Sequence, residues 1–323
     1  MNRAGLIAAA LAVVASAALS AALAAGFPDR PIKFINGFGA GGPTDIIARL
    51  LADRLSGDLG QNVVVENISG ASGNIATQAV AGADADGYTY LVGANPLAVN
   101  EALSPDFPVK FGSDLAAIAA IGATANVLVV RPSLNVRTLA EFVALARAKP
   151  NGVSYATVGI GSASHLAGVA LDLRAGTKML AVDYRGGGDA LKDLLGGSVD
   201  ARFASIPTVL GAVHDGSLIA VATTGPQRSA FLPDVPTIAE SGFPGYDVRL
   251  WVGVFARNGI PAEPQKIIEQ AIARAMASDD TVTALARQGI TPLAMSRAEF
   301  SAFVTQEIAR AKTLVAAFKP DER

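Results

Sequence analysis

The stretch F-I-N-G-F-G-A-G-G-P-T-D-I-I-A-R-L-L, residues 34–51, decides the fold. Apolar residues at its start indicate the end of a strand, and the glycines between 37 and 42 form a loop that can adopt positive φ. An amphipathic helix follows, with Thr44 as its expected N-cap and Asp45 in its first turn. This order of strand, glycine loop and helix predicts an anion-binding site, because first-turn N–H groups lack partners and the helix dipole favours negative charge.

The loop alone leaves three interpretations open. Gly37, Gly39 and Gly42 fit G-x-G-x-x-G, and Glu66 ends the next apolar strand, which is the pattern of a dinucleotide site. The same amides suit a small carboxylate. A glycine-rich turn that merely packs a helix onto a sheet has the same sequence.

Residues 1–25 have the pattern of a signal peptide. Arg3 provides the positive n-region, an uncharged apolar run extends from Leu6 to Leu23, and Ala22-Leu23-Ala24 fits the cleavage pattern. An uncleaved anchor is the alternative, because the run approaches spanning length. We expect cleavage and a periplasmic protein. Reduced nicotinamide cofactors are not expected in that compartment, which argues against the dinucleotide interpretation.

Composition excludes several classes of site. The chain has no cysteine, so disulfides, thiolate metal sites and cysteine nucleophiles are excluded. Its two histidines and its acids show no metal-ligand spacing, and we expect no metal and no cofactor. The net charge is −2 without a basic patch, so we expect no nucleic-acid partner. Its length predicts two lobes.

The remaining chain repeats the opening pattern. Strands at 32–35, 63–66 and 88–92 alternate with helices, which predicts an open α/β sheet with its ligand beyond the carboxyl ends of the strands. Two further strands are expected at 115–121 and 127–130, separated by a turn. Glycine loops before helices return at 159–165 and 184–188.

The sequence gives little support for catalysis. Ser162, Ser164 and His165 invite comparison with a hydrolase, but their spacing does not form a nucleophile–base pair, and G-I-G-S-A is not G-x-S-x-G. No close pair of carboxylates suggests general acid–base chemistry. We therefore expect a binding protein rather than an enzyme.

Nine segments together resemble a known family, the Bug-type (TctC-like) periplasmic solute-binding receptors of the tripartite tricarboxylate transporter systems. They are F-P-D-R-P-I-K-F-I (27–35), G-G-P-T-D-I-I-A-R-L (41–50), V-V-V-E-N (63–67), G-N-I-A-T (73–77), D-G-Y-T-Y-L (86–91), Y-A-T-V-G-I-G-S-A-S-H-L-A-G (155–168), Y-R-G-G-G-D-A-L-K-D-L-L-G-G-S-V-D (184–200), L-P-D-V-P-T-I-A-E-S-G (232–242) and W-V-G-V-F-A (251–256).

The resemblance implies an α/β Venus-flytrap architecture, in which each of two lobes is an open, mostly parallel sheet flanked by helices. Lobe 1 would comprise 26–123 plus 250–323, and lobe 2 would comprise 124–249. It also implies a ligand carboxylate held between the glycine loops of the two lobes. The ligand-binding residues expected from the sequence and the resemblance are Phe38, Gly41, Gly42, Thr44, Asp45, Asn95, Gly161, Ser162, Ala163, Ser164, His165, Arg185, Gly186 and Ala204.

Ala204 stands where the family often has Asp, which removes an acceptor for an ammonium group. We therefore expect a dicarboxylate, tricarboxylate or aromatic carboxylate without an amino group. By resemblance, a monomeric receptor would deliver this acid to the transmembrane subunits of a tripartite transporter. The alternatives are a sensing module for a two-component system and an exported hydrolase.

Overall fold

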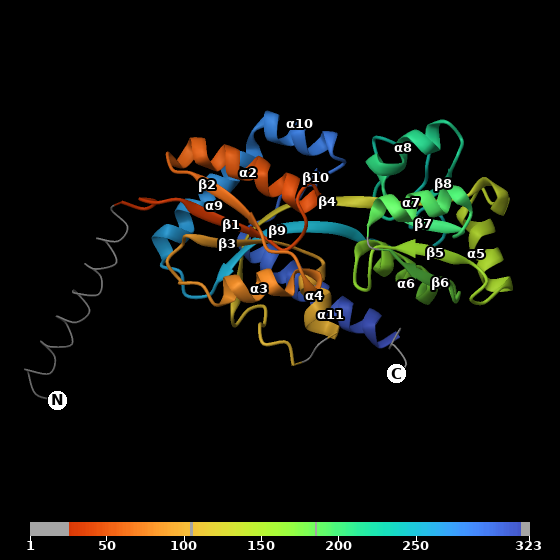
Figure 1. The fold of residues 1–323 in the computed structure, drawn as a ribbon, viewed down its shortest axis with the longest axis horizontal. Helices are drawn as coiled ribbons and strands as arrows, with labels where there is room; N and C mark the ends of the chain where they lie inside the picture. Colours follow the sequence, from red (N-terminus) through yellow and green to blue (C-terminus); the bar gives the residue numbers. More distant parts are fainter. Residues whose placement is uncertain (1–25, 104–105, 185, 318–323) are drawn as a thin grey trace, which may run out of the picture. The chain divides into compact units, whose positions relative to one another are not determined.

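The computed structural model describes residues 26–103, 106–184 and 186–317 (Figure 1), and the expected signal peptide at 1–25 lies outside them. The chain divides into two compact units. The first comprises residues up to Val92, Pro108–Ala119 and Val254–Ser278, and the second comprises Gly93–Phe107, Ala120–Gly253 and Asp279–Arg323. The expected lobes differ from this division by contacts, which assigns to the second unit four segments expected in lobe 1: 93–107, 120–123, 250–253 and 279–323. The expected lobe boundaries stay a prediction.

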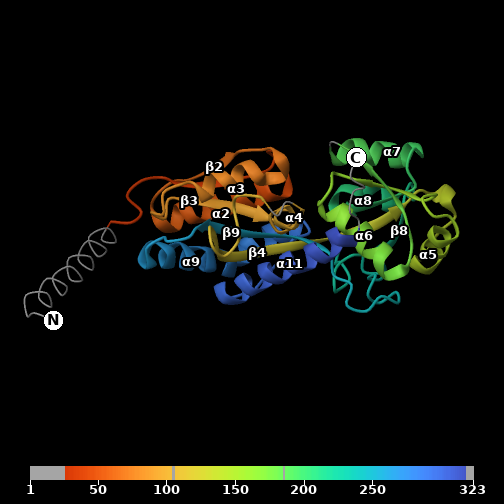
Figure 2. The ribbon, with the colours of Figure 1, turned by 90° about the horizontal axis from the view of Figure 1, so that it is seen from below.

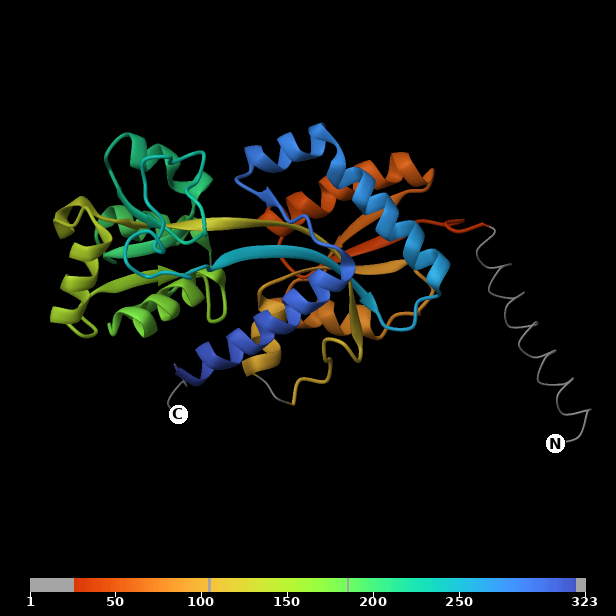
Figure 3. The ribbon, with the colours of Figure 1, turned by 180° about the vertical axis from the view of Figure 1, so that it is seen from behind.

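The first unit is built on parallel strands. Its elements are β1 (Ile32–Asn36), α2 (Pro43–Leu59), β2 (Val63–Asn67), the 3₁₀ turn η1 (Ala71–Gly73), α3 (Asn74–Ala81), most of β3 (Thr89–Ala94) and α9 (Ala262–Ala277). β1 pairs with β2 on one side and β3 on the other, so all three carboxyl ends lie at one edge. Helices α2 and α3 lie on opposite faces of these strands (Figures 1 and 3), and α2 packs against α9.

The start of α2 differs from the expected cap at Thr44. Gly42 is the N-cap, with φ −75° and ψ 166°, and Pro43 takes the first helical position. Proline suits this position because its fixed φ is helical and its missing N–H would lack a partner anyway. The residue before proline is driven to extended backbone, which sets the cap at Gly42. Thr44 is buried inside the first turn.

The second unit places helices on both faces of a mixed sheet. Its elements are α4 (Pro96–Leu103), the turn η2 (Pro132–Leu134), α5 (Leu139–Ala148), β5 (Ser154–Thr157), α6 (Ala163–Ala175), β6 (Leu180–Asp183), α7 (Gly187–Gly196), β7 (Ala201–Ser205), α8 (Ile206–His214), β8 (Ile219–Thr223), α10 (Asp279–Arg287), β10 (Thr291–Pro292) and α11 (Arg297–Ala317). Strands β4 (Leu115–Val130) and β9 (Arg249–Arg257) contribute residues to both units. Here the strand order is β4-β7-β5-β6, with β5 parallel to β6 and β7.

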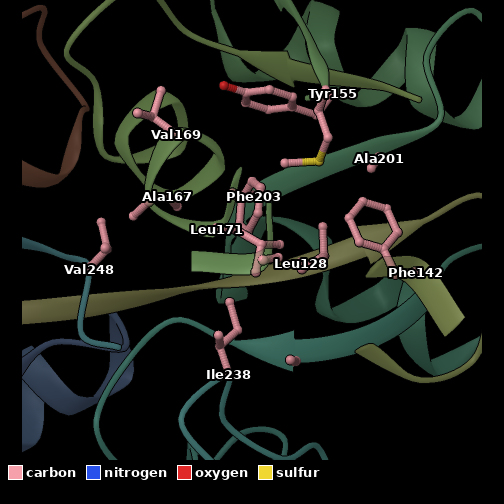
Figure 4. Close-up of a cluster of buried hydrophobic side chains, with 14 of the residues drawn as sticks. Leu128, Phe142, Tyr155, Ala167, Val169, Leu171, Ala201, Phe203, Ile238 and Val248 are labelled. Carbon is pink, nitrogen blue, oxygen red and sulfur yellow. The ribbon is translucent and has the colours of Figure 1, made fainter. Parts of the chain in front are cut away.

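Two apolar clusters hold α6 and α7 on opposite faces of this sheet (Figure 1). The cluster on the α6 side, shown in Figure 4, includes Phe142 and Tyr155, and Tyr155 packs edge-to-face on Phe203 of β7. The cluster on the α7 side includes Ala156 and Ala204. Neighbouring residues of β7 therefore face different helices, as the alternation of a strand requires.

The two strands expected at 115–121 and 127–130 are one continuous strand, β4, so that expectation is wrong. Gly122, which was expected to begin the turn, is a glycine for another reason. Gly122 pairs with Pro292 of β10, and a Cβ built on it would lie 2.6 Å from Ile290 Cγ2 and 3.0 Å from the Thr291 carbonyl oxygen. Glycine inside a strand commonly marks such a close approach of another backbone.

Helix α11, whose described residues end at 317, packs along α4 and reaches α6 (Figure 2). Among the described residues, no helix combines the length and apolar character that a membrane span requires. The same part of the chain contains no group of three or more acidic or histidine side chains suited to a metal ion.

Candidate functional site

The first glycine loop joins β1 to α2 and is fixed by close backbone packing. A Cβ on Gly37 would lie 2.9 Å from the Cα of Gly73, so this position requires glycine. The ring of Phe38 lies over Gly73, and Gly41 has φ +78°. The sequence-predicted residues of this loop, Phe38 to Asp45, are therefore gathered at the carboxyl end of β1 in the first unit.

The Asp45 carboxylate braces this loop from inside. It accepts hydrogen bonds from the Gly41 N–H at 2.8 Å, the Asn67 side-chain amide at 2.8 Å and Arg49 Nε at 3.0 Å. Asp45 is only 2% exposed. Burial raises the pKa of this carboxyl, but the hydrogen bonds from Arg49, Gly41 and Asn67 outweigh burial and hold the pKa below its usual value. The carboxylate is thus a structural part of the loop.

The first turn of α2 presents donors without acceptors. The N–H groups of Thr44 and Asp45 make no hydrogen bond to any described residue, whereas the next N–H, of Ile46, donates to Gly42. No side chain caps this helix. Unsatisfied first-turn amides at the positive end of a 17-residue helix favour a bound anion.

The second glycine loop joins β5 to α6 and is organised by hydroxyl groups. Ser162 is the N-cap, and its Oγ accepts from the His165 N–H at 3.3 Å. The same oxygen lies 3.1 Å from Thr157 Oγ1 and 2.9 Å from Ser164 Oγ. Ser164 Oγ in turn accepts from the Val158 N–H. This chain of hydroxyls fixes the loop from the strand end to the helix.

His165 supports the same loop through its ring. Its Nδ1 accepts a hydrogen bond from the Gly161 N–H at 3.3 Å, which places the ring proton of the neutral tautomer on Nε2. His165 is 5% exposed, and burial lowers its pKa more than the Asp183 carboxylate raises it. The imidazole is therefore neutral near pH 7. Gly161, with φ +80°, lies so close to Val99 that an added Cβ would be 2.7 Å from Val99 Cγ1.

The second loop again presents first-turn amides without acceptors. The N–H groups of Gly159, Gly161, Ser162 and His165 are all hydrogen-bonded within the loop. Those of Ala163 and Ser164 have no acceptor among the described residues. Beside them, Val158 and Ile160 are 42% and 48% exposed, so the loop combines amide donors with apolar side chains.

The third loop leads into α7. Arg185, an expected ligand residue, lies outside the described residues. Gly186 is the N-cap of α7, and no side chain caps the helix. The strand after α7 contributes a residue that the sequence analysis missed: Arg202 of β7, only 6% exposed, donates from Nη1 to the Gly187 carbonyl at 2.8 Å. An arginine inside the apolar strand A-R-F-A-S was the available signal.

Two expected ligand residues occupy interior positions. Asn95 is buried, and its side chain donates to the Arg249 carbonyl at 2.7 Å and accepts from the Trp251 N–H at 2.7 Å. Its amide group therefore fixes β9. Ala204 is fully buried in the cluster on the α7 side and offers no polar group. Their roles toward a ligand stay a prediction.

A pocket in the second unit lies beside Asn95, Val99 and the start of β9, and its charges are already paired. Arg249 lies 2.7 Å from Asp247, and Arg310 lies 3.0 Å from Glu307. Both arginines that line this pocket therefore already have an acidic partner. The helix N-termini, by contrast, present N–H groups without acceptors among the described residues.

One structural prediction concerns Ser162→Ala. Loss of an N-cap hydroxyl costs about 1 kcal/mol, so the free energy of unfolding should fall by about that amount in chemical denaturation. Thr138→Ala is the matched control, because Thr138 caps α5 in the same unit and accepts from the Glu141 N–H. Both variants should lose stability, but only Ser162→Ala should weaken binding of a carboxylic acid. Equal ligand affinity in the two variants would contradict a role for the second loop.

Comparison with known proteins gives consistent results. A model of the tripartite tricarboxylate transporter family receptor matches residues 47–319. Protein BugT of Bordetella pertussis is 38% identical over 313 residues, covering 96% of both chains. Two structures from Rhodopseudomonas palustris cover 90% of this chain: Rpa4515 with adipate (98% of that chain, 32% identity, TM-score 0.80) and MatC with bound malate (100% of that chain, 30% identity, TM-score 0.77). These neighbours confirm the predicted two-lobed α/β architecture.

Proposed function

The chain belongs to the receptors of the tripartite tricarboxylate transporter family, and from this premise we propose that it captures a small carboxylate-bearing organic acid and delivers it to a membrane transporter of the tripartite tricarboxylate type. The predicted resemblance to this family is confirmed. The family consists of periplasmic solute receptors rather than enzymes. Membership favours the small-anion interpretation of the first glycine loop over the dinucleotide interpretation.

One observation supports the proposal most directly. Two helices that each follow a strand and a glycine loop have first-turn amides without acceptors among the described residues, at Thr44 and Asp45 in α2 and at Ala163 and Ser164 in α6. We propose that both pairs of amides bind one ligand, as the family resemblance implies.

Residues 1–25 would direct the protein to the periplasm, and the receptor would act as a monomer.

The energetics of this arrangement suit a receptor. A hydrogen bond to a charged group contributes roughly 1.5–3 kcal/mol. Four amides would then supply roughly 6–12 kcal/mol before the costs of ordering the ligand. Micromolar affinity corresponds to about 8 kcal/mol, which lies within that range. The protein therefore needs no cluster of surface arginines to hold an acid.

We further propose that the ligand has no amino group. Ala204 of β7 provides no carboxylate to accept from an ammonium, and the side chain is fully buried. The similar structures with adipate and with bound malate contain acids of this class. The best initial probes are therefore adipate, malate, succinate and benzoate, with aspartate and glutamate as the amino-containing controls.

A thermal-shift screen with these probes tests the proposal. A ligand at about 100 times its Kd adds about 2.7 kcal/mol to the free energy of unfolding, so a cognate acid should raise Tm by several degrees. We expect the largest rise with an acid that lacks an amino group. A flat response to every acid would contradict the carboxylate receptor, whereas the largest rise with aspartate or glutamate would contradict only the absence of an amino group.

A further inference from the structure

Arg202 is a buried cation that has no acidic partner among the described residues. The residue is 6% exposed, and within the described part of the chain its side chain makes one hydrogen bond, from Nη1 to the carbonyl of Gly187. No carboxylate of the described residues forms an ion pair with it, and its remaining guanidinium N–H groups make no other bond there. A buried charge without a counter-ion is costly, so such a residue is commonly completed by an anion.

The guanidinium lies against an uncapped helix N-terminus. A Cβ built on Gly187 would be 2.8 Å from Arg202 Nη2, so glycine at this position makes room for the guanidinium. The N–H groups of Gly187, Gly188 and Asp189 have no acceptor among the described residues, and a Cβ on Gly188 would meet nothing within 4 Å. The cation and the positive end of the 10-residue helix α7 therefore coincide.

This place lies at the same sheet edge as the second glycine loop. Arg202 of β7 is paired in register with Ala156 of β5, one residue before β5 ends at Thr157. The loop to α6 begins at the next residue, so the N-termini of α6 and α7 both start from this edge. This sheet edge therefore carries two separate groups of donors within one unit. One is the Arg202 guanidinium with the first-turn amides of α7, and the other is the first-turn amides of α6.

We propose that Arg202 and the first turn of α7 form a second anion subsite, which binds the distal carboxylate of a dicarboxylate whose other carboxylate is held by the amides of α6. This inference rests on the proposed function and specifies its ligand as an acid with two carboxylates. The planar guanidinium suits a carboxylate because it presents parallel N–H donors. The exposed side chains of Val158 and Ile160 at the same edge suit an apolar spacer between the carboxylates.

Calorimetry with paired probes tests the subsite. The dicarboxylates from succinate to suberate would be compared with the monocarboxylates of the same chain lengths, butyrate to octanoate, on the full mature receptor. Wild type should bind one dicarboxylate more tightly than the matching monocarboxylate. In Arg202→Met the dicarboxylate affinity should fall about tenfold to a hundredfold, because charge-assisted hydrogen bonds are lost, and the monocarboxylate affinity should not change.

Two further variants separate charge from packing. Arg202→Lys retains the charge but loses the planar guanidinium, so its affinity for the dicarboxylate should lie between those of wild type and Arg202→Met. Gly187→Ala should displace the guanidinium and weaken dicarboxylate binding, whereas Gly196→Ala, at the opposite end of α7, where an added Cβ meets nothing within 4 Å, should not. In the Arg202→Met background, Gly187→Ala should have no further effect, because both changes act through the same group.

The outcomes distinguish this subsite from the proposed function. In the absence of ligand, the Tm of Arg202→Met should be no lower than that of wild type, because removing an unpaired buried charge does not destabilise the fold. Dicarboxylate affinity that is unchanged in Arg202→Met, or a wild type that binds monocarboxylates as tightly as dicarboxylates, would overturn the subsite and leave the carboxylate receptor intact. No binding of any carboxylate by wild type would overturn both.

Discussion

Ala163→Pro should weaken binding of the cognate acid about tenfold to a hundredfold while leaving the fold intact. Ala163 is the first residue of α6, and its N–H has no acceptor among the described residues. Proline removes that one donor, and its ring suits the first helical position. The preceding residue, Ser162, already has φ −65° and ψ 158°, the extended conformation that a following proline requires. The loss of affinity follows from one charge-assisted hydrogen bond.

Ala262→Pro is the matched control for this variant. Ala262 is the first residue of α9 and follows Pro261 with ψ 145°, so the backbone is equally compatible. Both prolines should leave Tm unchanged or raise it slightly, because proline restricts the unfolded chain. Calorimetry should show weaker binding for Ala163→Pro alone. Equal affinities in the two variants would remove the Ala163 amide from the ligand site.

Asp45→Ala should have the largest effect on stability. Its carboxylate joins the Gly41 amide, Asn67 and Arg49, and the substitution leaves at least one buried donor unsatisfied. We expect a loss of about 1–3 kcal/mol in the free energy of unfolding, measured by urea denaturation. The first glycine loop should lose its fixed conformation, so affinity for the acid should fall as well. Wild-type affinity in a destabilised Asp45→Ala protein would show that the loop does not contact the ligand.

The same carboxylate makes stability depend on acid pH. Its pKa in the folded protein lies below its usual value, since the hydrogen bonds from Arg49, Gly41 and Asn67 outweigh the opposing effect of burial. The contribution of Asp45 is therefore complete above the unfolded-state pKa of about 3.9 and is lost as the pH falls through the lower folded value. Asp45→Asn should flatten this part of the stability curve. An unchanged acid limb in Asp45→Asn would contradict the assignment.

Local patterns predicted most of the architecture. The glycine loops at 37–42 and 159–161 precede helices as expected, because glycine spacing and apolar periodicity are properties of neighbouring residues. The spacing T-x-x-E of Thr138 and Glu141 is likewise typical of a capping box, and this box begins α5. Its donors and acceptors lie within four residues, so sequence alone contains the whole motif.

Features that depend on distant segments were not predictable. Asp45 suggested a helix-dipole residue, but its brace requires Asn67 from the next strand. Asn95 looked like a strand-end ligand group, yet its side chain is engaged by β9, more than 150 residues along the chain. Gly122 was interpreted as part of a turn, because the strand that explains this glycine, β10, lies far away in sequence.

The importance of Arg202 was hidden for the same reason. Its position at the N-terminus of α7 follows from the register of β7 beside β5 and from the packing of α7 on that face of the sheet. The sequence shows no basic patch, and a single buried arginine is compatible with that. A single cation inside an apolar strand is informative only once its neighbours are known.

Amide chemical shifts test the central claim most directly, since the claim is that main-chain N–H groups at helix starts bind the acid. The ¹⁵N-labelled receptor would be titrated with the acid that gives the largest rise in Tm. We predict that the largest downfield shifts occur at the first-turn amides of α2 and α6, including Thr44 and Ala163. Unchanged first-turn amides, with shifts confined to the pocket beside Asn95 and Arg249, would contradict the account.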